Sequence, residues 1–510
     1  MAGHVSDILL SQLNEFVAAQ MGLYFPKERR RDLERGIDSA AREFDFQDTD
    51  SCIRWLISSP LTKNQIEILA GYLTVGETYF FREKNCFETL EARLLPDLIR
   101  SRRGAEPRLR IWSAGCCTGE EPYSIAMLLQ RLIPDLTKWN ITVLATDINP
   151  RFLQKASDGV YNEWSFRETP AWIKERYFTR TKEGRFEILP ELKKRVTFSS
   201  LNLAEDTYPS LTNNTNAMDI IFCRNVLMYF APERAKKVIH NLYRSLIDGG
   251  WLIVSPSETS QALFSQFATV NSPGLILYQK KDGDPSGRGQ AIEAFPDALG
   301  EGPGASFQPS VHFLTEPVPE AIVPHETRAL LPLQGEEQDI AKSPPAPYAE
   351  ATVLYEQGRY AEASEQIAGL LSDHPDDAKA MTLLARVYAN QGRLAEAFQW
   401  CERAIAADKL AAGCHYLLAT VLQERGQVEE AVRSLKRAMY LDPNFVLAHF
   451  ALGNMELRKG KVRAARKSFD NVLELLNSFR QEDILPESEG LTAGRFREII
   501  LATIQTGALA

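Results

Sequence analysis

The sequence predicts a multidomain chain, in which an N-terminal helical region precedes an α/β unit and an all-α repeat region. Three patterns carry this prediction. Apolar residues first recur at helical spacing, short apolar runs then alternate with helical stretches, and small residues finally return every 34 positions. At 510 residues the chain exceeds what one hydrophobic core usually serves, so two or three domains are expected.

Composition and charge exclude several classes of protein. A net charge of −9 argues against a general nucleic-acid binder. No apolar run is long enough for a membrane span, and the N-terminus lacks the pattern of a signal peptide. The seven cysteines show no metal-ligand spacing. We therefore expect a cytoplasmic protein without membrane insertion, nucleic-acid partner or bound metal.

The first two regions follow in order along the chain. Residues 1–100 are expected to form a helical domain, because apolar residues such as Ile8, Leu9 and Leu13 recur at helical spacing. A mostly parallel sheet covered by helices is expected over residues 101–281, with strands at 109–112, 141–146, 196–199, 218–223 and 251–254. Residues 161–195 interrupt this alternation and predict a small inserted subdomain.

The C-terminal half contains a linker and a repeat. Residues 282–343 are rich in proline and glycine and predict a flexible linker. Four glycines then stand 34 residues apart, and alanines keep the same period: Gly358, Gly392, Gly426 and Gly460, with Ala363, Ala397, Ala431 and Ala465. This period predicts four helix pairs over residues 344–479. Residues 480–510 are expected to hold a capping helix.

The segment LRIWSAGCCTGEEPY at 109–123 carries the first chemical signal. It reads as a strand, a turn of small residues and the start of a helix, and such turns bind nucleotides at the carboxyl end of open α/β sheets. No Lys-Ser/Thr pair follows, and Glu120 and Glu121 would repel a phosphate at the helix N-terminus. An acidic turn suits an uncharged ribose or a cation, and S-adenosylmethionine offers both.

Further polar residues follow the other predicted strands. Asp147 ends the second strand, where a carboxylate can accept hydrogen bonds from a ribose diol. Asn202-Leu203 follows the third strand and Arg224-Asn225 the fourth, with Tyr229 shortly after. Because the carboxyl ends of parallel strands share one edge of a sheet, these residues are expected to converge on one crevice.

Five segments in the same order resemble one family, the chemotaxis receptor-glutamate methyltransferases (CheR). The matching words are GETYFFRE, IWSAGCCTGEEPYSIA, ATDIN, FSSLNL and FCRNVLMYF, within residues 70–280. The resemblance implies a helical N-terminal domain and a Rossmann-like methyltransferase domain with a small β-subdomain insert. It implies methyl transfer from S-adenosylmethionine to glutamates of a chemoreceptor's cytoplasmic domain, which yields glutamate methyl ester and S-adenosylhomocysteine.

The resemblance also implies roles for particular residues. The cofactor-binding positions would be Gly76, Thr78, Arg82, Glu120, Asp147, Asn202, Leu203, Arg224 and Asn225. Arg82 and Tyr229 would lie nearest the reacting methyl group and are the candidate catalytic residues. The chain departs from the family at Gly76, where Asn is common, so one cofactor contact is expected to be missing. Ser-Pro-Ser-Glu at 255–258 replaces a His-containing turn of the family.

The 34-residue period resembles tetratricopeptide repeats, which bind proteins far more often than they catalyse reactions. Their expected ligand is a peptide or helix of an unidentified partner, or a second copy of the chain. Two alternatives to the receptor-glutamate methyltransferase stay open. One is a scaffold that binds S-adenosylmethionine without turnover, and the other is a methyltransferase that acts on a different protein or on a small carboxylate.

Overall fold

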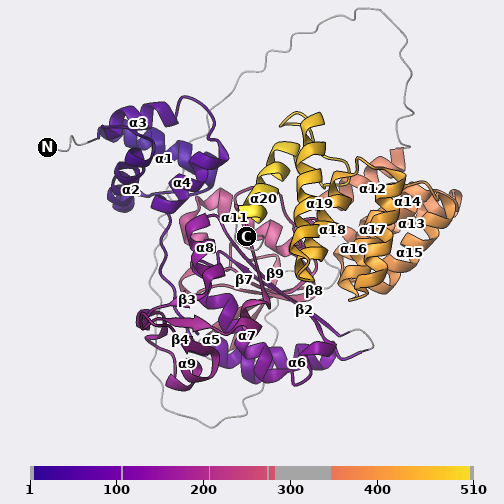
Figure 1. Cartoon of the computed structure of the whole chain (residues 1–510), viewed down its shortest axis with the longest axis horizontal. Coiled ribbons are helices and arrows are strands. Elements are labelled where there is room, and N and C mark those ends of the chain that lie inside the picture. The colour runs from indigo at the N-terminus through magenta and orange to yellow at the C-terminus, as the bar shows by residue number, and fades with distance from the viewer. Residues whose placement is uncertain (1–4, 105–106, 206, 273–274, 282–345, 506–510) are drawn as a thin grey trace, which may run out of the picture.

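The computed structural model describes residues 5–104, 107–205, 207–272, 275–281 and 346–505. The predicted linker at 282–343 lies outside these residues. Three regions follow one another along the chain: a group of N-terminal helices, a central sheet with its helices, and a stack of paired helices beside the sheet (Figure 1).

The N-terminal helices are α1 (Asp7–Met21), α2 (Arg30–Glu43), α3 (Thr49–Leu56) and α4 (Lys63–Leu73). They form because one face of each is apolar, and those faces pack into a common core that includes the fully buried Leu13 and Ile37. Ser6 caps the start of α1, and Gly22 ends it in the left-handed region at φ 78°. Two further helices lead to the sheet, α5 (Lys84–Thr89) and α6 (Leu95–Ser101).

The central sheet has seven strands in the order β6-β2-β1-β7-β8-β10-β9. The first five are parallel: β6 (Val196–Ser200), β2 (Asn140–Asp147), β1 (Arg108–Ala114), β7 (Met218–Phe222) and β8 (Leu246–Ile253). They confirm the predicted strands, although β8 starts five residues earlier than expected, with a register shift against β7. The apolar-run analysis missed β9 (Phe267–Ser272) and β10 (Leu275–Lys280), an antiparallel pair on the sheet's edge.

Alternate residues of the strands supply two cores, one on each face of the sheet. Ile111 belongs to the core that contains residues of α6 and of α7 (Glu120–Leu132). Trp112 belongs to the opposite core, against α11 (Pro232–Ser245). Helix α8 (Pro150–Asp158) follows β2, and a separate three-stranded sheet comes next along the chain: β3 (Val160–Tyr161), β5 (Phe186–Ile188) and β4 (Phe178–Arg180), with α9 (Ala171–Tyr177) and α10 (Pro190–Lys193).

The C-terminal region is a stack of helix pairs, as the 34-residue period predicts: α12 (Ala346–Glu356) with α13 (Tyr360–Asp373), α14 (Ala378–Asn390) with α15 (Leu394–Ala407), α16 (Ala412–Glu424) with α17 (Val428–Leu441), and α18 (Val446–Arg458) with α19 (Val462–Leu475). The periodic glycines end the first helix of each pair at φ values of 71° to 77°. The periodic alanines are fully buried where the helices cross. Helix α20 (Ala493–Gln505) packs on α19.

The helix stack contacts the sheet at the amino ends of its strands. The fully buried Arg110, on β1, forms an ion pair with Glu424 at the end of α16. The turn at Gly392 lies against Arg108, and the turn at Gly358 lies against Arg244 at the end of α11.

Candidate active site

The candidate active site is a pocket of about 410 Å³ at the carboxyl ends of the parallel strands. It lies beside the neighbouring strands β1 and β7, which are not consecutive in the chain, where α/β sheets bind ligands. Most of the sequence-predicted site residues line it: Thr78, Arg82, Asp147, Asn202, Leu203, Arg224, Asn225 and Tyr229. Glu120 and Gly76 are absent from this lining.

The glycine turn after β1 brings backbone to the surface of the pocket. Gly115 has φ 83°, and a Cβ atom there would collide with the side chain of Val226. The backbone N–H groups of Gly115 and Cys116 both donate to the carbonyl of Thr146, at 2.8 and 2.9 Å. The turn is therefore tied to the end of β2 and exposes main chain where a planar ligand fits.

Asp147 stands at the end of β2, on the floor of the pocket. Its carboxylate accepts hydrogen bonds from the backbone N–H groups of Cys117 (2.8 Å) and Asn149 (2.9 Å). Burial raises the pKa of Asp147 to about 6, although these backbone donors oppose the shift. The carboxylate is thus oriented by its own loop and still available to hydroxyl donors from a ligand.

Asn202 offers the clearest sign that the pocket accepts a polar ligand. Its side-chain oxygen accepts the N–H of Ala204 at 3.0 Å, which fixes the orientation of the amide. Its Nδ2 atom is buried and has no hydrogen-bond partner among the residues that the structure describes. A buried donor without a partner costs free energy, so a ligand acceptor is expected opposite Asn202.

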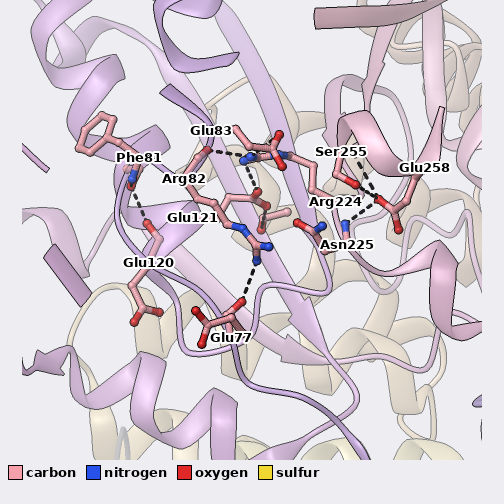
Figure 2. A network of polar contacts seen from close by, with 12 residues as sticks. Glu77, Phe81, Arg82, Glu83, Glu120, Glu121, Arg224, Asn225, Ser255 and Glu258 are labelled. Atoms are coloured by element: carbon pink, nitrogen blue, oxygen red, sulfur yellow. Dashed lines mark hydrogen bonds and ion pairs between the residues drawn. The ribbon is translucent and has the colours of Figure 1, made fainter. Parts of the chain in front are cut away.

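Arg224 lies on a network of carboxylates (Figure 2). Its guanidinium pairs with Glu83 at 2.8 Å and with Glu121 at 3.0 Å, and donates to the carbonyl of Arg82 at 2.7 Å. Burial alone would lower the pKa of Arg224, but its interactions with Cys86, Glu121 and Glu83 outweigh burial and raise the pKa. Arg224 is therefore a fixed cation that ties the loop carrying Arg82 to β7 and to the start of α7.

The two candidate catalytic residues also line the pocket. Arg82 donates from Nη1 to the carbonyl of Glu77 at 2.8 Å, so its guanidinium is held at the pocket (Figure 2). Tyr229 ends a short 3₁₀ helix, and burial raises the pKa of its hydroxyl. The guanidinium of Arg29 lies 5.0 Å from the centre of the Tyr229 ring, and the N–H of Tyr24 donates to the Tyr229 carbonyl at 2.8 Å.

Sequence reasoning missed Glu258, which holds the loop after β7. Its carboxylate accepts the backbone N–H groups of Asn225 (2.6 Å), Val226 (2.8 Å) and Met228 (3.2 Å). Asn225 is thereby kept in the left-handed region at φ 58°. Glu258 also forms a capping box with Ser255, so the S-x-x-E pattern of Ser-Pro-Ser-Glu is the signal that could have revealed it.

Two predicted residues lie outside the pocket lining. The Glu120 carboxylate turns away and bonds with the hydroxyls of Thr118 (2.6 Å) and Ser165 (3.0 Å), while burial raises its pKa. A Cβ atom on Gly76 would come within 2.7 Å of the Phe152 ring, and Phe152 itself lines the pocket. The ring occupies the space that a side chain at position 76 would need, which accounts for glycine there.

The end of α1 and the segment after it also contribute to the pocket, which the sequence did not indicate. Met21 and Leu23 lie on its wall, and Leu23 pairs as an isolated β-bridge with Phe230.

Within the described residues, no three His, Cys, Asp or Glu side chains gather into a possible metal site. None of the described helices combines the length and apolar character that a membrane span requires.

Comparisons with known proteins agree with this geometry. The family described as CheR methyltransferase, SAM binding domain, matches residues 76–275, and tetratricopeptide repeat families match residues 348–412 and 420–460. A chemotaxis protein methyltransferase of Borreliella burgdorferi is 32% identical over 253 residues, which are 49% of this chain and 87% of the relative. Chemotaxis protein methyltransferase 1 of Pseudomonas aeruginosa is 35% identical over 220 residues, 42% of this chain and 77% of the relative.

Proposed function

The chain belongs to the chemotaxis protein methyltransferase family and carries tetratricopeptide repeats, and we propose that it methylates glutamate side chains of a chemoreceptor. The coarser activity, methyl transfer that depends on S-adenosylmethionine, follows from the family. The observation that carries the finer proposal is the pocket, whose lining combines Asp147 with Arg82 and Tyr229.

The residues present fit S-adenosylmethionine, which supplies an electrophilic methyl group on a sulfonium. Asp147 would hold the ribose hydroxyls, because its carboxylate keeps acceptor capacity beyond its two backbone donors. The unpartnered Nδ2 of Asn202 would donate to the adenosine part. Asn225 and the Gly115 turn would complete the cradle, and Arg224 and Glu258 would keep that cradle in place.

The reaction needs no general base in the proposed site. A substrate glutamate has an ordinary pKa near ~4.3 and is already a carboxylate at pH 7. Its oxygen forms the new bond to carbon, the carbon–sulfur bond breaks, and the electron pair leaves with sulfur. No proton moves, so the work of the chain is alignment, which can supply roughly 7–11 kcal/mol of barrier reduction.

Arg82 and Tyr229 would do this alignment. The planar guanidinium of Arg82 can hold one carboxylate oxygen of the substrate, and the fixed contact with the Glu77 carbonyl limits its rotation. The Tyr229 hydroxyl stays protonated at neutral pH, because burial raises its pKa, so it can donate to the other oxygen. Arg29, stacked on the Tyr229 ring, would add positive charge where an acidic receptor helix approaches.

The repeats, in this proposal, bind a protein partner or a second copy of the chain. If the substrate is the cytoplasmic part of a receptor, the enzyme acts in the cytoplasm.

We also propose the domain boundaries 1–100, 101–281 with its insert at 161–195, 282–343, 344–479 and 480–510. The isolated fragment 1–281 tests the boundary after residue 281, because the fragment should fold and bind S-adenosylhomocysteine.

The proposal is tested with the purified chain, S-adenosylmethionine labelled on its methyl group and a cytoplasmic fragment of a receptor. Incorporation that is lost in base and disappears when the receptor glutamates are changed to alanine is the expected result. Transfer only to another protein would replace the receptor as substrate. Binding of S-adenosylhomocysteine without transfer to any tested protein would favour the scaffold alternative.

A further inference from the structure

The first helices of the repeats, α12, α14 and α16, together hold a segment of the chain itself, residues 483–491. The face that holds this segment, which includes Tyr355, Arg386 and Gly413, is called the groove below. Glu487 forms an ion pair with Arg386 on α14, and the hydroxyl of Tyr355, at the end of α12, donates to Glu489 at 2.6 Å. The first helices of two successive repeats therefore each hold one carboxylate of the segment. Leu485 is fully buried and joins the apolar core of the last repeats.

The groove is built to receive these carboxylates. Asn390 donates to the Tyr355 oxygen at 3.0 Å, which directs the Tyr355 proton toward Glu489. Burial raises the pKa of Tyr355 well above its ordinary value, so the hydroxyl remains a donor. Gly413, at the start of α16, leaves room for Glu487, because a Cβ atom there would lie 2.8 Å from a carboxylate oxygen. Arg386, Tyr355 and Gly413 thus come from three successive repeats.

The segment adopts a constrained backbone in order to reach these positions. Glu487 and Glu489 have φ values of 63° and 56°, in the left-handed region that side chains other than glycine rarely adopt. A hydrogen bond from the N–H of Leu485 to the carbonyl of Leu491, at 3.0 Å, closes the turn. The tethered segment therefore occupies the groove at a cost in backbone strain.

The segment also joins the groove to the sheet region. Glu489 accepts the backbone N–H of Leu211 at 2.8 Å, and Leu211 belongs to the loop before β7. Beside it, the Thr212 side chain hydrogen-bonds with Tyr416 on α16. Removal of Glu489 from the groove would therefore loosen one of the contacts between the repeats and the methyltransferase region.

We propose that the groove is a binding site for an acidic segment of a partner protein, and that residues 487–489 occupy it in cis until the partner displaces them. The recognised pattern is two glutamates separated by one small residue, because Ser488 between them is only 2% exposed. A tethered ligand has an effective concentration in the millimolar range, so it masks the groove from a weak competitor. The proposed binding site does not depend on the methyl-transfer activity proposed above.

The test uses the full-length chain and a fluorescent peptide with the sequence of residues 483–492. Wild-type chain is compared with the double variant Glu487→Gln/Glu489→Gln, which keeps the shape of the segment and removes its charges. The double variant is expected to bind the peptide at least about tenfold more tightly, because its groove is open for a larger fraction of the time. Addition of Arg386→Gln should remove this gain.

The matched control is Glu482→Gln, because Glu482 is exposed and lies just outside the segment. It should bind the peptide as the wild type does, and a peptide with both glutamates changed to glutamine should not bind. A folded double variant that binds no more tightly than wild type would overturn the proposal. If the double variant does not fold, the proposal is tested instead by amide hydrogen exchange of the wild-type chain with and without the peptide. Millimolar peptide must increase exchange at residues 480–492, and unchanged exchange there overturns the proposal.

Discussion

The two ends of strand β1 have opposite chemistry. At the carboxyl end, the turn at Gly115 opens onto a pocket whose wall includes the unpartnered Nδ2 of Asn202. At the amino end, three nitrogens of Arg110 are all engaged, by the carbonyl of Asn216 (3.2 Å), the carbonyl of Asn214 (3.0 Å) and Glu424. Both ends bury polar groups, but the guanidinium of Arg110 is fully engaged by the chain, whereas the Nδ2 of Asn202 faces a pocket without a partner among the described residues.

This difference separates a ligand site from a structural joint. Buried polar groups in a folded chain are almost always paired, so an unpaired donor that lines a pocket indicates where a ligand acceptor fits. The ion pair of Arg110 with Glu424 instead joins two regions of the chain. Although burial alone would raise the pKa of Glu424, the charges of Arg110, Arg108 and Arg458 outweigh it and lower the pKa. Changes at the carboxyl end should alter catalysis, whereas changes at the amino end should alter docking.

Arg82→Ala should give the largest effect, at the carboxyl end. Because Arg82 would orient the incoming carboxylate, kcat should fall at least about a hundredfold. Affinity for S-adenosylhomocysteine, measured by calorimetry, should change far less, because Asp147 and Asn202 would hold that molecule in the proposed site. Arg82→Lys, which keeps the charge without the planar fork, should recover only part of the loss. Equal losses in turnover and affinity would show that Arg82 is only a cofactor ligand.

Glu424→Gln should give the largest effect at the amino end. It leaves Arg110 buried without its anionic partner, which should weaken docking of the repeats by about 3 kcal/mol. Scanning calorimetry should then resolve an earlier, separate unfolding step, while methyl transfer stays near the wild-type rate. Because the pKa of Glu424 is lowered, its contribution is present above the ordinary value of 4.5 and is lost as the pH falls through the lowered pKa.

The control for Glu424 is Glu430→Gln, in an exposed pair with Arg433, which should leave the calorimetric trace unchanged. A parallel loss of turnover in Glu424→Gln would contradict the separation of the two ends. It would show instead that the docked repeats support the active site.

The pH dependence of cofactor binding tests Asp147. Burial raises its pKa to about 6 in the free protein, so below that pH the carboxyl is increasingly protonated and loses acceptor capacity for ribose hydroxyls. Affinity for S-adenosylhomocysteine should therefore fall about tenfold between pH 7 and pH 5. Asp147→Asn should bind weakly and show a flat profile over this range. A flat profile in the wild type would exclude Asp147 as the titrating ligand.

Glu258→Gln should give the smallest effect, because Glu258 would not contact the ligand itself and acts only through the loop that it holds. The glutamine keeps one acceptor oxygen and loses the other, which weakens the hold on Asn225 by about 1–2 kcal/mol. Affinity and turnover should then fall together, by up to about tenfold. Glu233→Gln, an exposed change on α11, is the control and should leave both unchanged. Loss of turnover alone would assign Glu258 to the chemistry instead.

Sequence reasoning succeeded where the signal was local. It failed where the outcome depended on the direction in which a helix side chain points or on how elements pack. The apolar runs predicted five strands because parallel strands buried on both faces are almost continuously apolar. The same approach missed the edge pair β9 and β10. Glu120 and Glu121 are adjacent in sequence, but helix geometry separates them by roughly 100°. Only the folded chain shows that Glu121 faces Arg224 and Glu120 faces Ser165.

The sequence by itself determined the order of the regions and the glycine turn, and most of the residues that it indicated for the site do line the pocket, because these features follow from periodicity and from motifs of contiguous residues. Tertiary structure alone decided which groups meet across long distances in the chain. The ion pair of Arg110 with Glu424, the occupation of the repeat groove by Glu487 and Glu489, and the Glu258 contacts depend on how separate elements pack. No local pattern encodes such pairings, since each needs two surfaces to be brought together first.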